Sequence, residues 1–210
     1  MPATLGRIMT RHPGWPAELR YQHVGLRPMR MRDASAWSEL RLRNEEWLAP
    51  WEPSSPDPWA GRHSVAAFPP LLSRLRRMAR SGVALPWAVV YDNRFVGQLT
   101  VINIVRGAFD SGQVGYWVDR AVAGRGIIPT AVALAVDHCF GPVGLHRVQV
   151  DIRPENAASR RVVAKLGFRE EAYFARYLDI DGGWRDHIGY ALTREDCPNG
   201  LVRLLPAVTS

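Results

Sequence analysis

The stretch "AVAGRGIIPTAV", residues 121–132, places two glycines around an arginine directly before an apolar segment. Gly124 and Gly126 leave the backbone uncovered, and Pro129 suits the first turn of a helix, where amide hydrogens have no helical partner. The stretch predicts a loop followed by a buried helix over about residues 127–140, because that segment is apolar nearly all round. Free N–H groups and the helix dipole make the loop a candidate anion site.

The loop lacks the features of two common phosphate-binding motifs. A P-loop needs a lysine and then serine or threonine after its glycines, but Ile127 and Ile128 follow Gly126. A dinucleotide-binding fold needs a third glycine near Pro129, where the sequence has none. A turn without any ligand therefore remains an alternative for this stretch taken alone.

A second segment, "RPENAASRRVVAKLGF" at residues 153–168, predicts a capped helix after a strand. Asn156 can cap the helix, and Ser159 lies one turn further on the same side. Gly167 fits the left-handed position that ends a helix, with Phe168 contacting Val163. Architecture alone explains each residue, so a cap without another role and a surface hydroxyl remain alternatives.

The remaining pattern predicts an alternation of strands and helices. β-branched and aromatic runs indicate strands, and apolar residues at a spacing of three to four indicate helices. Strands are predicted at residues 24–31, 84–91, 94–105, 111–119, 145–153, 168–180 and 184–193, and further helices at 34–51, capped by Asp33, and at 64–80, interrupted at Pro69–Pro70. Residues 1–22 are predicted as an irregular lead-in and residues 197–210 as a tail, which leaves one domain over 23–196.

Composition limits the class of protein. The chain has 210 residues, no apolar run long enough to cross a bilayer, and no signal-peptide core at its start, so we expect a cytoplasmic protein without membrane contact. Cys139 and Cys197 lack the spacing of metal ligands, and we expect no metal. A net charge of +7 suits an anionic partner such as a ribosome or a phosphorylated cofactor, although a solvated helix face explains it equally well. No motif for sequence-specific DNA binding accompanies the charge, which includes Arg74, Arg76, Arg77 and Arg80.

Taken together, these segments resemble the GCN5-related N-acetyltransferase (GNAT) family, and within it the RimJ/RimL-type enzymes. The family's pyrophosphate loop reads Gln/Arg-x-x-Gly-x-Gly/Ala, and "AGRGII" at 123–128 aligns with it. "ENAASRRVVAKLGF" is similar to the Asn-x-x-Ser helix and Gly-Phe close of the Rim branch, as are "LRPMRMRDASAW", "NEEWLAPWEP" and "VGYWVD". Ala123 and Ile128 depart from the loop pattern, and Gln113 stands where the family often has a glutamate base.

The resemblance implies an α/β GNAT fold: a mixed, mostly antiparallel seven-stranded sheet with splayed central parallel strands and about four flanking helices. It implies acetyl-CoA as co-substrate, with the pantetheine arm between the strands at 111–119 and 145–153. Residues implied in binding it are Trp117, Val118, Ala123, Gly124, Arg125, Gly126, Ile127, Ile128, Asn156, Ser159 and Arg160.

The reaction implied is direct attack of a primary amine on the thioester. The Val118 N–H is implied as the donor to the oxyanion. Ser159 is the first candidate to protonate the thiolate, with Asn156 orienting the coenzyme. Candidates for a base are Glu46, Asp186 and His187, with Tyr173 and Tyr177 in reserve as acids.

The acceptor is the open question. The resemblance implies the N-terminal alanine of a ribosomal or other protein, bound near Trp47, Trp51, Glu45 and Glu46, although core tryptophans would look the same. A small amine, such as an antibiotic or a polyamine, is an alternative acceptor. A non-catalytic acyl-CoA-binding module is a further alternative.

Overall fold

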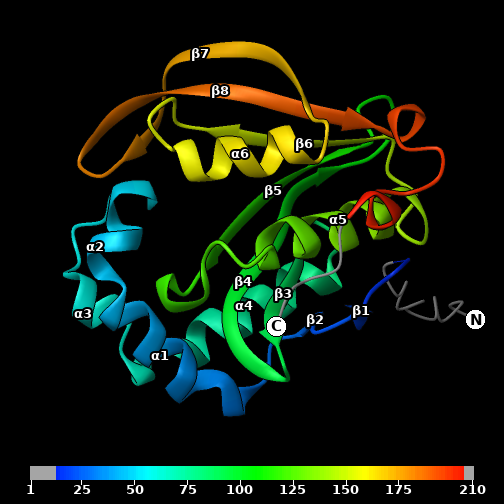
Figure 1. The fold of residues 1–210 in the computed structure, drawn as a ribbon. Coiled ribbons are helices and arrows are strands. Elements are labelled where there is room, and N and C mark those ends of the chain that lie inside the picture. The colour runs from blue at the N-terminus through cyan, green and yellow to red at the C-terminus, as the bar shows by residue number, and fades with distance from the viewer. Residues whose placement is uncertain (1–12, 206–210) are drawn as a thin grey trace, which may run out of the picture.

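An open sheet of eight strands organises the protein (Figure 1). The computed structural model describes residues 13–205 of the chain. The strand order is β1-β2-β3-β4-β5-β6-β8-β7, and every neighbouring pair is antiparallel except β5 and β6. The strands are β1 Leu19–Tyr21, β2 Val24–Pro28, β3 Leu85–Tyr91, β4 Arg94–Val105, β5 Ser111–Val118, β6 Arg147–Ile152, β7 Arg169–Ile180 and β8 Gly183–Thr193.

The parallel pair β5–β6 separates along its length. The two strands pair only from Ser111 opposite Arg147 to Gln113 opposite Gln149, while β5 runs on to Val118 and β6 to Ile152. The predicted mixed fold with splayed central parallel strands is therefore confirmed. The splay leaves main-chain groups of both strands without a sheet partner at the centre of the molecule.

The eighth strand lies in the segment that was predicted as an irregular lead-in. Leu19 and Tyr21 of β1 pair with β2 and pack against the main core. Trp15 meets Trp87 edge to face, and the Trp87 indole donates to the Ala17 carbonyl at 3.0 Å. The prolines and glycines of this segment indicated irregular structure. The contacts depend on large aromatic side chains, whose packing does not require a periodic sequence pattern. Residues 1–12 and 206–210 lie outside the described part of the chain.

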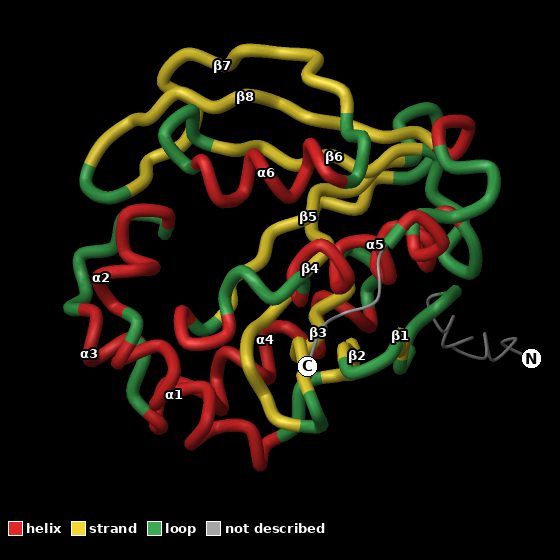
Figure 2. Tube along the Cα trace, in the orientation of Figure 1, coloured by secondary structure: helices red, strands yellow, loops and turns green. Residues whose placement is uncertain are grey.

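Six α-helices flank the sheet on two sides (Figure 2). Two of them are single turns, which explains the difference from the four predicted. The core beneath α5 and α6 includes Val148, Val150 and Ile152 of β6, while Trp37 of α1 and Phe68 of α4 build a second core on the other face. The helices are α1 Ala34–Arg43, α2 Glu45–Leu48, α3 Trp59–Arg62, α4 Phe68–Arg80, α5 Ile127–Phe140 and α6 Ala157–Lys165.

Two helix boundaries differ from those predicted. The helix expected over 34–51 breaks at Asn44, whose side chain donates to the Leu40 carbonyl and to Asp119 instead of staying at the surface. Pro69 and Pro70 lie in the first turn of α4 and do not interrupt it. Tertiary contacts of Asn44 therefore set the end of α1, and the position of the two prolines within the first turn lets α4 continue. Local composition alone predicts neither boundary.

Candidate functional site

The glycine loop leads directly into α5, as predicted. Gly124 and Gly126 have φ values of 82° and 78°, which favour glycine, and α5 begins at Ile127. A Cβ at either glycine would meet no atom within 4 Å, so the space beside this backbone is open. The first N–H groups of a helix have no partner within it, so the loop offers main-chain donors to an anion.

A cavity of about 640 Å³ extends from this loop to α6. It brings together most of the predicted cofactor-binding residues: Trp117, Val118, Ala123, Gly124, Gly126, Ile127, Ile128, Asn156 and Ser159. Asn156 caps α6 as predicted, accepting the Ser159 N–H at 3.0 Å, and Gly167 and Phe168 close the helix with bonds to Ala164 and Val163. Two separate sequence motifs therefore line one cavity.

Two predicted residues do not line this cavity. Arg125 is absent from its wall, and Arg160 turns away to the Tyr190 hydroxyl at 3.3 Å. Arg161 and Lys165 supply the cations instead, one turn apart on α6. Ala158, Arg161 and Lys165 are three and four residues apart, so they share one face of α6. This spacing was the feature of the sequence that could have identified the two cations.

A second cavity of about 310 Å³ adjoins the first at the splayed strands. Both cavities are lined by Trp51, Glu52, Tyr116, Trp117, Asn156 and Ser159. We call the larger one the loop cavity and the smaller one the gap cavity. Their common wall lies where β5 and β6 part.

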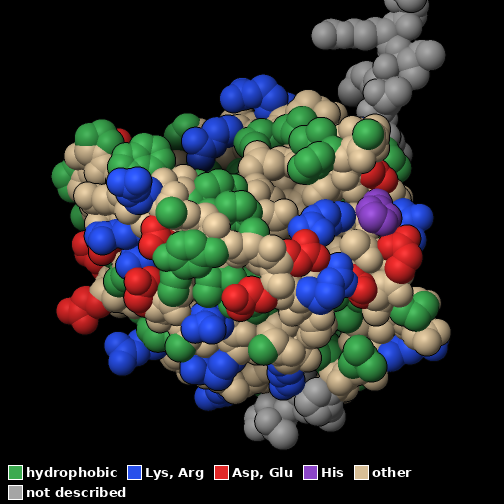
Figure 3. Space-filling model, turned by 90° about the horizontal axis from the view of Figure 1, so that it is seen from above, with side chains coloured by type: hydrophobic (Ala, Val, Ile, Leu, Met, Phe, Trp, Pro, Cys, Tyr) green, Lys and Arg blue, Asp and Glu red, His purple; other side chains and the backbone are tan. Residues whose placement is uncertain are grey.

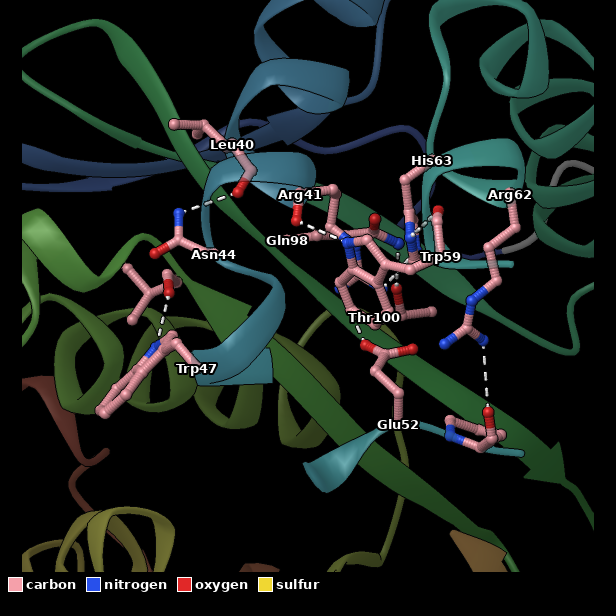
Figure 4. A network of polar contacts seen from close by, with 12 residues as sticks. Leu40, Arg41, Asn44, Trp47, Glu52, Trp59, Arg62, His63, Gln98 and Thr100 are labelled. Carbon is pink, nitrogen blue, oxygen red and sulfur yellow. Dashed lines mark hydrogen bonds and ion pairs between the residues drawn. The ribbon is translucent and has the colours of Figure 1, made fainter. Parts of the chain in front are cut away.

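The backbone of β5 has a donor that points into the gap. The Asp119 N–H bonds to the Val96 carbonyl at 2.8 Å, on the β4 side. Because N–H directions alternate along a strand, the Val118 N–H points away from β4. The Val118 carbonyl accepts the Trp47 indole N–H at 3.3 Å, so α2 buttresses this position (Figure 4).

Tyr116 is a site residue that sequence reasoning missed. Its hydroxyl is buried and has no hydrogen-bond partner of good geometry among residues 13–205. Burial raises the pKa of Tyr116 to about 12, and the facing Ser159 side chain partly offsets this rise. Alternation along β5 places Tyr116 with Val114, on the face that α5 and α6 cover. Alternation in the sequence indicates the face of β5 on which Tyr116 lies, but only the structure shows that the Ser159 side chain faces it.

A buried polar contact holds α1 against the start of the glycine loop. Asn44 donates to Asp119 at 2.9 Å and accepts the Arg120 N–H at 3.0 Å. Burial opposes ionisation of Asp119, but hydrogen bonds from Asn44 and Arg43 outweigh it and keep the pKa of Asp119 below its ordinary value. The loop is thus anchored from the helical layer as well as by the sheet.

A buried arginine, Arg41, contacts two residues that line the gap cavity, Glu52 and Trp117 (Figure 4). The Arg41 guanidinium lies 5.0 Å from the ring centres of both Trp59 and Trp117. It donates to Glu52 at 2.8 Å and contacts the His63 Nε2 at 2.8 Å. Burial and then the Arg41 charge lower the pKa of His63 to about 4, so a neutral His63 accepts from Arg41 near pH 7.

The structure separates the candidate bases. Glu45 and Glu46 are exposed, and neither lines either cavity. Asp186 is half-buried and accepts the Tyr173 hydroxyl, also outside both cavities. His187 lines the gap cavity, as do Trp51 and Glu52, while Trp47 lines the loop cavity.

Gln113 and Tyr177 have structural partners. Gln113 accepts from Asn103 at 2.5 Å and donates to Asp151 at 2.9 Å. Tyr177 stacks on Phe174, with ring centres 4.7 Å apart.

The buried Cys139 has a pKa raised by burial to about 12, so its thiol stays protonated near pH 7.

Comparison with known proteins identifies the family. A GNAT acetyltransferase domain matches residues 23–169 of the chain. The chain belongs to the GNAT acetyltransferase family. As a GNAT protein it is an acetyl-CoA-dependent N-acetyltransferase, and its loop and splayed strands are the parts that the sequence resemblance implied.

Three relatives of this GNAT protein are informative. RimJ of Mycobacterium smegmatis, solved in complex with CoA-disulfide, is 48% identical, with a TM-score of 0.89 over 92% of this chain and 95% of that one. The uS5-alanine N-acetyltransferase of Escherichia coli is 29% identical over 177 residues, 80% of this chain and 87% of that protein. The probable N-acetyltransferase YjcK of Bacillus subtilis is 37% identical over 105 residues, 50% of this chain and 58% of that protein.

Neither a cluster of metal-ligating side chains nor a helix able to cross a membrane occurs within residues 13–205. Within residues 13–205, no three His, Cys, Asp or Glu side chains gather in a way that could hold a metal ion. None of the helices in the same range combines the length and apolar character that crossing a bilayer requires.

Proposed function

We propose that this GNAT protein transfers an acetyl group to the N-terminal alanine of a ribosomal or other protein. The observation that carries the proposal is the pair of cavities that meet at Tyr116 and Ser159, because they give two substrates access to one point in the sheet. Relatives similar over most of their length are named for ribosomal-protein alanine acetylation and RimJ. The proposal includes a cytoplasmic location, where ribosomal proteins are made.

In this proposal acetyl-CoA occupies the loop cavity. The main-chain donors at Gly124–Ile128 bind the diphosphate, and Arg161 and Lys165 add positive charge. The pantetheine amides pair with the backbone groups that β5 turns away from β4, as an added strand would. Ala123 and Ile128 depart from the family's loop where it binds through its backbone, so we expect weaker or altered diphosphate contacts and not their loss.

Attack of the neutral amine on the thioester carbon forms the new C–N bond and an oxyanion. In this proposal the Val118 N–H, which points away from β4, stabilises that oxyanion, and one such donor is worth about 3 kcal/mol of barrier. Collapse breaks the C–S bond, and the thiolate takes a proton from the Ser159 hydroxyl, beside Tyr116. The surplus proton of the newly bonded nitrogen then restores the Ser159 hydroxyl. Asn156 keeps its role as the cap that fixes the first turn of α6.

Replacing Gly126 with valine is expected to weaken acetyl-CoA binding by about 10-fold or more, the loss of roughly 1.4 kcal/mol. The branched side chain would fill the open space beside the loop and disfavour its φ of 78°. Calorimetric titration with acetyl-CoA measures the change. Gly144→Val is the matched control: Gly144 has a φ of 76° and equally open surroundings but lines neither cavity. Equal loss in both variants would contradict the assignment of the loop.

The exposed arginines of α4 support a ribosome contact as part of this proposal. Arg74, Arg76, Arg77 and Arg80 are exposed, and none takes part in the ion pairs formed between residues 13–205. On the face seen over β7 and β8, by contrast, acidic and basic side chains alternate (Figure 3). A helix face of one sign suits RNA phosphates.

Acetyl transfer to an alanine-starting ribosomal-protein peptide, measured beside an aminoglycoside and spermine, tests the proposed acceptor. We expect kcat/KM for the peptide to exceed that for either small amine. Mass spectrometry of protein N-termini from cells with and without the chain should show loss of acetylation at an alanine terminus. Preference for spermine or the aminoglycoside, with unchanged cellular N-termini, would replace the proposed acceptor by a small molecule.

A further inference from the structure

Two carboxylates line the gap cavity, and they differ in their partners. Glu52 is paired with Arg41 at 2.8 Å. Asp151 takes no part in the ion pairs of the described chain and instead accepts two neutral amides, Gln113 at 2.9 Å and Gln149 at 2.8 Å. Since its charge is not neutralised by a contacting cation, Asp151 is the carboxylate available to a cationic substrate.

Asp151 faces the gap from the side opposite to Ser159. Val150 and Ile152, its neighbours on β6, lie in the core under α5 and α6. Because side chains alternate along a strand, Asp151 points to the other face. The gap between β5 and β6 therefore has a carboxylate on one face and two hydroxyls, Ser159 and Tyr116, on the other.

The amide contacts fix the orientation of Asp151. The Asn103 amide donates to the Gln113 carbonyl oxygen at 2.5 Å, which turns the Gln113 amide nitrogen toward Asp151. Gln113 on the neighbouring strand β5 thus holds Oδ2 of Asp151, and Gln149 on Asp151's own strand, β6, holds Oδ1. The two carboxylate oxygens together have four lone-pair sites, and the two amides and the Tyr177 hydroxyl use three of them, so one site stays open to a further donor.

Charged and titratable groups approach Asp151 from three strands. These are Arg147 of β6, Tyr177 of β7 and His187 of β8. Burial raises the pKa of Asp151, and the Gln149 hydrogen bond and the charges of His187 and Arg147 partly oppose the rise. Arg147 is paired with Glu171 at 2.6 Å, and Arg153, which lines the gap cavity, is paired with Glu155 at 3.3 Å.

We propose that Asp151 binds the ammonium group of the acceptor in the gap cavity and removes its proton before attack. The proton passes from nitrogen to an Asp151 oxygen, and the freed lone pair attacks the thioester carbon. The C–S bond then breaks and the Ser159 hydroxyl gives its proton to the thiolate. The second surplus proton of the amide nitrogen restores the Ser159 hydroxyl, and Asp151 later loses its proton to solvent. The inference rests on the proposed function only for the identity of the amine.

The test is the pH dependence of kcat/KM for wild-type protein and Asp151→Asn, with alanine peptide and spermine as acceptors. The wild-type protein reacts when Asp151 is ionised and the amine is protonated, and both forms dominate between their two pKa values. The kcat/KM of the wild-type protein should therefore be constant from the pKa of Asp151 up to that of the amine. The variant needs the neutral amine, whose pKa is near 8 for a peptide terminus. Its kcat/KM should rise about tenfold per pH unit up to that value, with a deficit of about 10²-fold at pH 6.5.

The deficit of Asp151→Asn should shrink at least tenfold by pH 9, a recovery that damage to the fold would not produce. Asp92→Asn is the matched control, since Asp92 is an exposed carboxylate in the β3–β4 turn outside both cavities. A variant profile parallel to wild type at all pH values would overturn the assignment of Asp151. Transfer to spermine alone would overturn the proposed protein acceptor and leave the Asp151 profile measurable. Transfer to neither amine would overturn both.

Discussion

Replacing Arg41 with alanine is expected to lower the free energy of unfolding by about 3 kcal/mol, the usual cost of breaking a buried ion pair. The Arg41 side chain is only 5% exposed, and its removal leaves Glu52 without its cation at a partly buried position. The variant also loses the stacking of a guanidinium between Trp59 and Trp117. Urea unfolding at pH 7 measures the change.

Arg76→Ala is the control for loss of an arginine, because Arg76 is exposed on α4 and should change stability by less than about 0.5 kcal/mol. A double-mutant cycle with Glu52→Gln separates the pair from the stacking. If Arg41→Ala and Glu52→Gln are simply additive, the Arg41–Glu52 bond does not contribute. The residual loss then belongs to the contacts of Arg41 with the two tryptophans and with His63.

The order of strands and helices was predictable because most of it follows from local periodicity. β5 and α5 stand on either side of the glycine loop, and both appear where the pattern indicated them. The break at Asn44 was not predictable in this way, since its cause is Asp119, 75 residues away. β1 was missed for the same reason: Trp87 fixes that segment from another strand.

The residues of the candidate site also fall into those that local motifs predict and those that depend on contacts distant in the sequence. The loop and the start of α6 were predictable, because motif spacing places Gly126 and Ser159 at the beginnings of helices. Tyr116 and Asp151 were missed, since each lies within a strand whose facing partner only the three-dimensional structure shows. Asp186 was chosen for its charge, but alternation cannot tell which end of a long hairpin reaches the cavity.

The splayed sheet links these observations physically. A continuous sheet would satisfy the backbone of β5 with β6 and would leave no path between its faces. Parting the strands beyond Gln113 frees the Val118 N–H and joins the loop cavity to the gap cavity. The two cavities therefore meet at one point in the sheet, which is where the proposed function brings the two substrates together.

Ser159→Ala is expected to reduce kcat by about 10²-fold, because the departing thiolate loses its proton donor. The KM for acetyl-CoA should change by less than about threefold, since the cap of α6 uses the Ser159 backbone N–H, which alanine retains. Tyr116→Phe should lower kcat in the same way, by about tenfold, because its buried hydroxyl has no other partner of good geometry in the described chain. Steady-state kinetics with saturating acceptor measures both.

The double variant decides whether the two hydroxyls act as one unit. Groups that act together are not additive, so Ser159→Ala with Tyr116→Phe should fall little below Ser159→Ala alone. Multiplicative losses would mean that Tyr116 acts separately, for example by shaping the wall between the cavities. Ser73→Ala, at an exposed position on α4, controls for loss of a helical hydroxyl. Unchanged kcat in Ser159→Ala would move the proton donor elsewhere and leave Tyr116, facing the same gap, as the remaining hydroxyl within reach.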